Sequence, residues 1–265
     1  MAIIQISMMS NCFRRSVSIS VILPVENLVF QEEGKPRELP PMNPGPFKTL
    51  YLLHGYTGDH LDWLTYSNIR QLAQEHRLAV VMPSGENSFY INHEAAGEFY
   101  SDFISQELLA MTRGIFPLST KREDTFIGGI SMGGYGALLT ALKHPETFSH
   151  VFAMSSALQL CENRPTEANT LLPYIEGTFG PLGESVESEK NPRHVFESWK
   201  NAGMSGESPR VFMACGTEDR LITMNRYYRD FFSENNFDLT YFESPGVHSW
   251  DFWNGYLKKA IEWLP

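Results

Sequence analysis

The sequence has few cysteines, no long apolar run and fewer basic than acidic residues. Its three cysteines, Cys12, Cys161 and Cys215, are odd in number and lack the spacing of metal ligands, so we expect no disulfide framework and no cysteine metal site. No stretch approaches the roughly 18 consecutive apolar residues of a membrane-spanning helix. With 21 basic against 31 acidic residues the formal net charge is −10, which disfavours binding to nucleic-acid phosphates or anionic lipid.

The N-terminal segment, residues 1–20, does not have the pattern of a signal peptide. Arg14 and Arg15 follow its apolar stretch instead of preceding it, and no small-residue cleavage site comes after them. Together with the cysteine content, this predicts a reduced, cytoplasmic protein. The 265 residues are 42% hydrophobic and 13% aromatic, which suffices for a large core and excludes disordered, collagen-like and coiled-coil classes.

Short apolar runs alternate along the chain with segments of helical periodicity. Strands are predicted at residues 16–23, 49–53, 78–82, 125–130, 150–154, 210–214 and 239–243. Helices are predicted at residues 61–74, 97–116, 132–143, 224–234 and 250–263. This alternation predicts an α/β fold with a mostly parallel central sheet and helices on both of its faces.

Two stretches interrupt the alternation. Residues 25–47 are rich in proline, glycine and glutamate, and we expect them to form a surface loop. Residues 159–207 lie between two predicted strands and are too many for a structureless loop in a compact domain. We expect this second stretch to be a small inserted cap of short helices in a chain, residues 1–265, that otherwise forms a single domain.

The most informative motif is Gly-x-Ser-x-Gly at Gly129, Ser131 and Gly133. It lies between the predicted strand 125–130 and the predicted helix 132–143, where the serine must adopt a strained backbone conformation and glycines avoid a clash. This is the nucleophile-elbow pattern, and it predicts a nucleophilic Ser131. The alternatives are a tight strand-to-helix turn with a capping serine, and a phosphate-binding loop, which the glycine spacing and the absence of a following Lys-Ser/Thr pair disfavour.

A nucleophilic serine needs a general base, which follows it in the sequence when the serine lies in such an elbow. Among four downstream histidines we prefer His248, because it follows a predicted strand and the turn 244–246 at the same sheet edge as Ser131. The alternatives are His144 at a helix end, His150 at the start of a strand and His194 in the predicted cap.

The acid that orients this base is expected in the loop after the strand 210–214. Both Glu218 and Asp219 stand there; we prefer Asp219, with Glu218 as the alternative. The alternative role for Asp219 is to cap the next helix. We expect that one residue cannot easily both cap a helix and orient an imidazole.

Acyl transfer also needs two N–H donors, together called the oxyanion hole, for the tetrahedral intermediate. The first predicted donor is Met132, the residue after the nucleophile. The second is expected in the glycine-containing loop 54–58, at Tyr56 or alternatively at Gly55. His54 is expected to be a structural hydrogen-bonding residue.

Aromatic residues near the same sheet edge are candidates for the walls of a substrate pocket. Phe89 and Tyr90, with Phe99 and Tyr100, follow the third predicted strand, and Trp250 begins the last predicted helix. The alternative for each is ordinary core packing or, for Trp250, anchoring of that helix. No His/Cys/Asp cluster has the spacing of metal ligands, and hydrolysis by a serine nucleophile requires no metal and no cofactor.

Four motifs occur in the order expected of a known family: LLHGYTG at 52–58 with Trp63 shortly after, GISMGGYG at 129–136, CGTED at 215–219 and GVHSW at 246–250. As a set, over about residues 16–264, they resemble the tributyrin-esterase family of bacterial serine esterases, which is related to esterase D (S-formylglutathione hydrolase) and to acetylxylan and feruloyl esterases. The resemblance implies an α/β-hydrolase fold and carboxylesterase activity on short acyl esters. It implies the triad Ser131, Asp219 and His248 and the N–H donors Tyr56 and Met132.

The predicted reaction is a two-step acyl transfer from a small-molecule ester to Ser131, with His248 as general base. Activity should fall as the pH drops through about 6.5, where an ordinary imidazole takes up a proton. The alternatives that share these motifs are an acetyl or feruloyl esterase for sugar-linked esters, a thioesterase like S-formylglutathione hydrolase, and a hydrolase fold kept as a binding module. No nucleic-acid or membrane partner is expected, and a homo-oligomer stays open.

Overall fold

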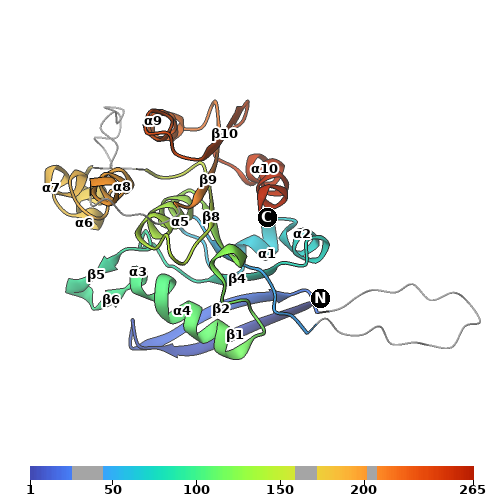
Figure 1. Cartoon of the computed structure of the whole chain (residues 1–265). Helices are drawn as coiled ribbons and strands as arrows, with labels where there is room; N and C mark the ends of the chain where they lie inside the picture. The colour runs from blue at the N-terminus through green and yellow to red at the C-terminus, as the bar shows by residue number, and fades with distance from the viewer. Residues whose placement is uncertain (26–43, 159–171, 202–207) are drawn as a thin grey trace, which may run out of the picture.

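The computed structural model describes residues 1–25, 44–158, 172–201 and 208–265, and within them one eight-stranded sheet forms the centre of the molecule (Figure 1). The strand order is β1-β2-β4-β3-β7-β8-β9-β10. The bounds are β1 (Ala2–Ser10), β2 (Arg15–Leu23), β3 (Thr49–Leu53), β4 (Ala79–Pro83), β7 (Thr125–Ile130), β8 (His150–Met154), β9 (Arg210–Gly216) and β10 (Leu239–Ser244). A separate small hairpin consists of β5 (Asn92–His93) and β6 (Glu98–Phe99).

The sheet is mostly parallel, as the sequence predicted. From β4 through β3, β7, β8 and β9 to β10 each strand pairs in parallel with its neighbour, whereas β2 runs antiparallel to both β4 and β1. The carboxyl ends of β3, β7, β8, β9 and β10 therefore lie at one edge of the sheet, and the loops that follow them are brought close together.

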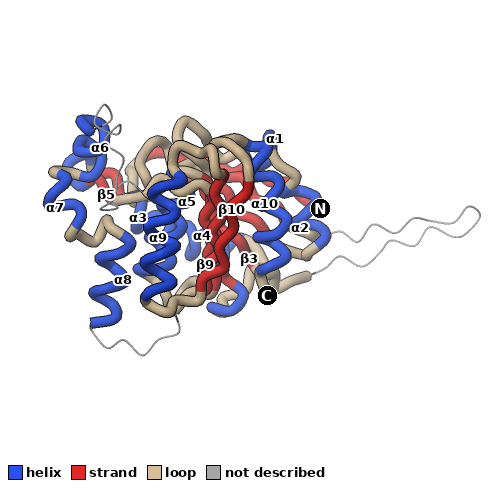
Figure 2. The backbone as a smooth tube through the Cα atoms, turned by 90° about the horizontal axis from the view of Figure 1, so that it is seen from above, coloured by secondary structure: helices blue, strands red, loops and turns tan. Residues whose placement is uncertain are grey.

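Successive residues of the central strands contribute to two hydrophobic cores, one on each face of the sheet. In β3, Tyr51 and Leu53 belong to one core and Leu50 and Leu52 to the other. Because both faces are covered, these strands are continuous apolar runs and do not alternate with polar residues. Figure 2 shows α5 and α9 on one side of the strands and α2 and α10 on the other, which confirms the predicted arrangement of helices on both faces.

Helices occur at all the positions that the sequence predicted, but two of the predicted helices are interrupted. Three are continuous: α5 (Met132–Lys143), α9 (Ile222–Glu234) and α10 (Trp250–Trp263). The single helix predicted at 61–74 is instead α1 (Asp62–Tyr66) and α2 (Ile69–Glu75), because Ser67 between them is extended. The helix predicted at 97–116 begins as α3 (Tyr100–Asp102), continues as a π-helical turn, η2 (Phe103–Glu107), and ends as α4 (Leu108–Ile115). None of the helices in the described residues is both long and apolar enough to cross a bilayer.

Strand β1 is an element that the sequence did not predict. It pairs with β2 over its whole length, from Ala2 opposite Leu23 to Ser10 opposite Arg15. The turn between the two strands is held by Glu107 of η2, whose carboxylate accepts hydrogen bonds from the Ser10 hydroxyl at 2.6 Å and the Asn11 N–H at 2.7 Å. Burial raises the pKa of Glu107, but these donors outweigh it and lower the pKa to about 2, so the carboxylate stays charged.

The stretch predicted as a cap is described in its middle part, and residues 159–171 and 202–207 lie outside the described residues. Residues 172–201 form three short helices: α6 (Leu172–Phe179), α7 (Leu182–Val186) and α8 (Pro192–Asn201). They are joined to the main body by hydrogen bonds from the hydroxyls of Tyr135 to Lys190 O at 2.5 Å and of Tyr228 to Asn191 Oδ1 at 2.6 Å. Most of the loop predicted at 25–47 also falls outside the description, at residues 26–43.

Candidate active site

Three side chains from separate loops form a continuous chain of hydrogen bonds at the carboxyl edge of the sheet. Ser131 follows β7, Asp219 follows β9 and His248 follows β10. Nε2 of His248 lies 3.0 Å from Oγ of Ser131, and Nδ1 of His248 lies 2.8 Å from Oδ2 of Asp219. These are the distances and the order that a serine nucleophile, its base and an orienting acid require. The structure thus brings together the three residues that the sequence singled out.

Ser131 has the backbone conformation of a strained turn. Its φ of 53° and ψ of −117° lie outside the regions that non-glycine residues usually adopt, at a cost of about 1–3 kcal/mol. Hydrogen bonds hold it there, because its N–H donates to Met154 O at 2.9 Å and its carbonyl accepts from Ala157 N–H at 2.9 Å. A Cβ atom on Gly133 would lie 2.4 Å from Leu53 O, so this position must be glycine for α5 to begin beside the end of β3.

The carboxylate of Asp219 is buried and uses both of its oxygens. Oδ2 contacts His248, and Oδ1 accepts the N–H of Leu221 at 2.9 Å, just before α9. Burial raises the pKa of Asp219, but the hydrogen bond and charge of His248, the Leu221 N–H and the Ser155 hydroxyl outweigh it, so the pKa is lower than usual. The N-cap residue of α9 is Leu221, so Asp219 does not occupy the capping position that was the alternative to orienting the imidazole.

Glu218, the alternative acid, is exposed and points elsewhere. Its Oε2 accepts the Gly246 N–H at 2.6 Å, which fixes the turn before His248. The alternative bases likewise have other partners. His144 pairs with Glu146 and His194 with Glu187, while the ring of His150 lies against those of Phe126 and Trp263.

The loop after β3 lies directly beside the nucleophile. A Cβ atom on Gly55 would lie 3.5 Å from Cβ of Ser131. The N–H of Thr57 donates to Asn87 Oδ1 at 2.8 Å and is thus already used. Met132 opens α5, where the first N–H groups of a helix have no acceptor within the helix. Met132 and Tyr56 therefore stay the predicted oxyanion donors, on two segments that meet at Ser131.

His54 has the structural role that the sequence suggested. Its Nε2 accepts the Gly85 N–H at 2.7 Å, so the proton resides on Nδ1, which donates to Gly55 O at 2.7 Å. Burial lowers the pKa of His54, which keeps the ring neutral. Both ring nitrogens are thus occupied in shaping the loop, and neither can serve as a base for Ser131.

The aromatic residues predicted to line a pocket do not lie together: some are in the core, and Phe89 lies beside the loop 54–58. Tyr90 is buried, its hydroxyl donates to His54 O at 3.0 Å and its ring packs against Gly136, so the pocket role predicted for it is wrong: it supports the loop from the core side. Tyr100 is also buried, with its ring tilted against that of Phe13. Phe89 does lie beside the site, because its ring contacts that of Tyr56 with the centroids 6.4 Å apart.

Trp250, two residues after His248, packs its ring against three aromatic rings, one of which is that of Trp253. Its ring packs against Trp63, with the centroids 5.1 Å apart, and against Tyr66. Trp250 thus anchors the start of α10 on α1, which was the alternative to its pocket role. The tryptophan that contacts His248 is Trp253, with ring centroids 5.0 Å apart and the ring planes at 90°. Trp253 was not among the predicted pocket residues, although it lies three residues after Trp250 on the same side of α10, with the two rings in contact.

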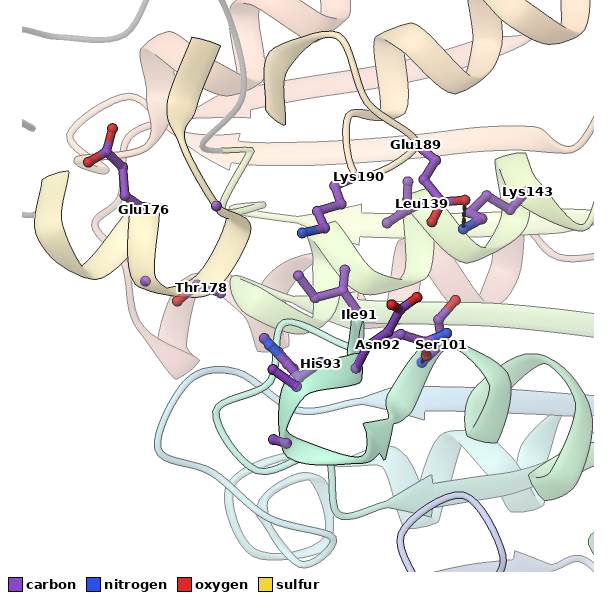
Figure 3. Close-up of a pocket in the computed structure, with 15 residues that line it drawn as sticks. Ile91, Asn92, His93, Ser101, Leu139, Lys143, Glu176, Thr178, Glu189 and Lys190 are labelled. Carbon is purple, nitrogen blue, oxygen red and sulfur yellow. Dashed lines mark hydrogen bonds and ion pairs between the residues drawn. The ribbon is translucent and has the colours of Figure 1, made fainter. Parts of the chain in front are cut away.

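A cavity of about 550 Å³ lies further along α5, lined by this helix, by α6 and by the β5–β6 hairpin (Figure 3). Leu139 and Lys143 of α5 line it, together with Asn92 and His93 of the hairpin and Lys190. Leu139 is eight residues after Ser131, or about 12 Å along the helix axis. None of the predicted pocket residues lines this cavity, and it is separate from the triad.

Comparison with known proteins identifies the relatives of this chain. The family model described as "Putative esterase" matches residues 36–264. A curated relative, the acetyl esterase of Caldicellulosiruptor saccharolyticus, is 39% identical over an alignment covering 100% of this chain and 98% of that protein. Among solved structures, the fluorophosphonate-binding serine hydrolase FphF of Staphylococcus aureus superposes with a TM-score of 0.81 at 30% identity, covering 99% of this chain and 98% of that one.

A second solved structure from Staphylococcus aureus, the S-formylglutathione hydrolase FrmB, gives a TM-score of 0.79 at 29% identity, with the alignment covering 99% of this chain and 98% of the other. These likenesses confirm the α/β-hydrolase fold and the kinship with bacterial serine esterases that the motifs indicated. The chain belongs to the Esterase family and is a serine esterase, a carboxylic ester hydrolase of the α/β-hydrolase fold.

Proposed function

We propose that this esterase hydrolyses short-chain acyl esters of small alcohols through a triad of Ser131, His248 and Asp219. The observation that carries the assignment is the unbroken chain of hydrogen bonds from Ser131 Oγ through His248 to Asp219, at 3.0 and 2.8 Å. Asp219 keeps the proton of the neutral imidazole on Nδ1, so the lone pair of Nε2 faces the serine hydroxyl.

In the acylation step, Nε2 of His248 takes the proton of the Ser131 hydroxyl while Oγ bonds to the ester carbonyl carbon. The carbonyl oxygen becomes an oxyanion that accepts hydrogen bonds from the N–H groups of Met132 and Tyr56. When the tetrahedral intermediate collapses, the bond to the alcohol oxygen breaks and the imidazolium gives its proton to the departing alcohol. An acyl group then remains on Ser131.

Deacylation repeats these steps with water as the nucleophile. His248 takes a proton from the water, whose oxygen bonds to the acyl carbon, and the same N–H groups hold the second oxyanion. Collapse breaks the bond to Ser131 Oγ, which regains a proton from the imidazolium. Asp219 stays ionised throughout, in keeping with a pKa that its hydrogen bonds hold below the usual value.

Two observations support a short acyl group. The curated relative that is 39% identical carries the name acetyl esterase. Close to Tyr56, the ring of Phe89 packs against those of Phe179 and Tyr135, with centroids 5.0 and 5.8 Å apart, and Tyr135 lies one helical turn beyond Ser131. These packed rings lie beside the loop 54–58, and we expect them to restrict the length of the acyl group.

We also propose that residues 159–207 form a small cap on the single domain. We further propose a cytoplasmic location, which agrees with the free thiols of Cys12 and Cys215.

The test compares hydrolysis of p-nitrophenyl acetate, butyrate and octanoate by the wild type and by Ser131→Ala. We expect fast turnover of acetate and butyrate, much slower turnover of octanoate, and loss of all activity in the variant while its thermal unfolding stays near that of the wild type. Equal rates in both proteins would contradict the role of Ser131, and faster cleavage of octanoate would contradict the short acyl pocket.

The likeness to FrmB makes a thioester the second candidate substrate. Both reactions use the same triad, so the two substrates are distinguished by rate alone. S-formylglutathione should be included in the same series, and a kcat/KM for it at least 100-fold above that for p-nitrophenyl acetate would assign the protein as a thioesterase instead.

A further inference from the structure

Trp253 connects the base of the triad to a second buried residue. Its indole N–H donates a hydrogen bond to Oγ of Ser155 at 3.0 Å, although the two residues are 98 positions apart in the sequence. The same indole ring stands at 90° to the imidazole of His248, with the centroids 5.0 Å apart. Ser155 is 0% exposed and Trp253 is 6% exposed, so both interactions are shielded from water.

Ser155 is fixed at the carboxyl end of β8, beside the acid of the triad. Its φ of 45° lies in the left-handed region, and its N–H donates to Ala214 O at 2.8 Å, which ties it to the neighbouring strand β9. The Ser155 hydroxyl is among the groups that lower the pKa of Asp219, and it also acts to lower the pKa of the Cys215 thiol, which burial raises. A non-glycine residue held at a positive φ by its surroundings is often found at a functional site.

The proton of the Ser155 hydroxyl has one strong acceptor. An indole can only donate, so Ser155 Oγ accepts from Trp253 and keeps its own proton for another partner. The candidates are the carboxylate of Asp219 and the sulfur of Cys215, and an ionised carboxylate is much the stronger acceptor. Asp219, which also accepts from His248 and Leu221, is therefore the expected acceptor of the Ser155 proton, in accord with the lowered pKa of this carboxyl group.

We propose that Ser155 and Trp253 are positioning residues for the triad: Trp253 directs the Ser155 hydroxyl toward Asp219 and supports the imidazole of His248 with its ring. This inference rests on the proposed function. The four side chains form a circuit in which Trp253 donates to Ser155, Asp219 pairs with His248 and the ring of His248 packs against Trp253. The link from Ser155 to Asp219 is the inferred part of the circuit and accords with the lowered pKa of Asp219. Neither Ser155 nor Trp253 touches the reacting atoms.

The circuit has a consequence for the strength of the base. A hydroxyl that donates to Asp219 withdraws part of its negative charge from the bond to His248. Without this donor the carboxylate holds the imidazolium more tightly, so the base becomes available only at higher pH. The other titratable group facing Asp219 is Cys215 of β9, with Glu243 of β10 and Arg226 of α9 close to Cys215, and none of these is changed in the variants below.

The first test is Ser155→Ala, with Ser156→Ala as the matched control. Ser156 is the next residue and is also 0% exposed, but among the described residues its hydroxyl has no hydrogen-bond partner. For Ser155→Ala we expect kcat for p-nitrophenyl acetate to fall about tenfold, the cost of one hydrogen bond to a charged group, with KM nearly unchanged. The acid limb of the pH profile of kcat/KM should move to higher pH by a few tenths of a unit. Ser156→Ala should show neither change.

The second test is Trp253→Phe, with Trp263→Phe as the control. Phenylalanine keeps an aromatic ring at this position and removes the N–H donor together with part of the ring volume. The control removes the same groups at Trp263 of the same helix, whose indole N–H has no partner among the described residues. We expect Trp253→Phe to lower kcat several-fold and Trp263→Phe to leave it unchanged. In the double variant Ser155→Ala/Trp253→Phe the losses should not add, because both substitutions break the same hydrogen bond.

A readout without turnover separates this inference from the proposed function. The proton between His248 Nδ1 and Asp219 gives a far-downfield proton NMR signal, which should shift in Ser155→Ala and stay in place in Ser156→Ala. Loss of hydrolysis in Ser131→Ala tests the proposed nucleophile and says nothing about the roles of Ser155 and Trp253. The circuit is overturned if Ser155→Ala and Ser156→Ala behave alike in rate, pH profile and NMR signal, or if the losses of Ser155→Ala and Trp253→Phe add in full.

Discussion

Asp219 holds His248 with one carboxylate oxygen and the backbone of Leu221 with the other, at 2.8 and 2.9 Å. Since Leu221 directly precedes α9, the carboxylate is fixed to the start of a helix and cannot rotate freely. The imidazole is thereby held with Nδ1 toward the acid and Nε2 toward Ser131 Oγ. A single side chain thus links the packing of α9 to the orientation of the base.

This geometry predicts different effects for the two neighbouring acids. Asp219→Asn should lower kcat by about 10³-fold or more, because the amide no longer stabilises the imidazolium and favours the wrong tautomer. Glu218→Gln should lower kcat by less than about threefold, because an amide oxygen can still accept the Gly246 N–H. Steady-state kinetics on p-nitrophenyl acetate measures both. Comparable losses in the two variants would contradict the assignment of Asp219.

Two glycines within helices should respond to alanine in opposite ways. In Gly133→Ala the new Cβ would lie 2.4 Å from Leu53 O, so we expect a loss of stability of about 1–3 kcal/mol and displacement of the oxyanion loop with a loss of kcat. In Gly255→Ala the new Cβ meets no atom within 4 Å, and we expect a gain of about 1 kcal/mol with unchanged activity. Urea unfolding and kinetics on both variants test this pair. A tolerated Gly133→Ala would show that the elbow is not closely packed.

His150 should make the protein less stable in mild acid. Burial, together with the charges of Arg210 and Arg122, lowers its pKa from 6.5 to about 4. Between these values the unfolded chain binds the proton and the folded chain does not, so stability is full above pH 6.5 and falls as the pH drops toward 4. The Nε2 atom also has no partner among the described residues, which disfavours a protonated ring. We expect a loss on the order of 2 kcal/mol over this range.

The matched substitutions His150→Gln and His144→Gln separate this effect from general acid sensitivity. His144 pairs with Glu146 and has a side chain that is 26% exposed. Unfolding followed at pH 7, 5.5 and 4 should show a weaker pH dependence for His150→Gln than for the wild type, and an unchanged one for His144→Gln. The same slope in all three proteins would exclude His150 as its source.

The sequence predicted those features that depend on local pattern. The strands at 125–130 and 150–154 and the helices at 132–143 and 250–263 have the predicted bounds, because continuous apolar runs and helical periods are strong signals. The triad side chains could be chosen because parallel strands place the loops after them at one edge. Their catalytic roles stay predictions that the kinetic variants test.

Features that depend on side-chain direction and on distant packing could not be read from the sequence. Trp250 and Trp253 lie on the same side of α10 with their rings in contact, and the packing of this helix decides that Trp253 is the one that meets His248. Tyr90 follows a strand at the correct edge, yet a positive φ of 56° turns its ring inward onto the core. Strand β1 does carry a period-2 signal, with Ile4, Ile6 and Met8 toward the core, but its place in the sheet depends on pairing with β2 and on the distant Glu107 that holds the turn.

The position of the nucleophile is the central claim, and covalent labelling tests it most directly. A fluorophosphonate should react with the activated serine hydroxyl, which bonds to phosphorus as fluoride leaves, and peptide mass spectrometry then locates the adduct. We expect one adduct per chain, on Ser131, formed in parallel with the loss of esterase activity and much more slowly in His248→Asn. Complete inactivation with the adduct on another residue, or full activity after Ser131 is labelled, would contradict the account.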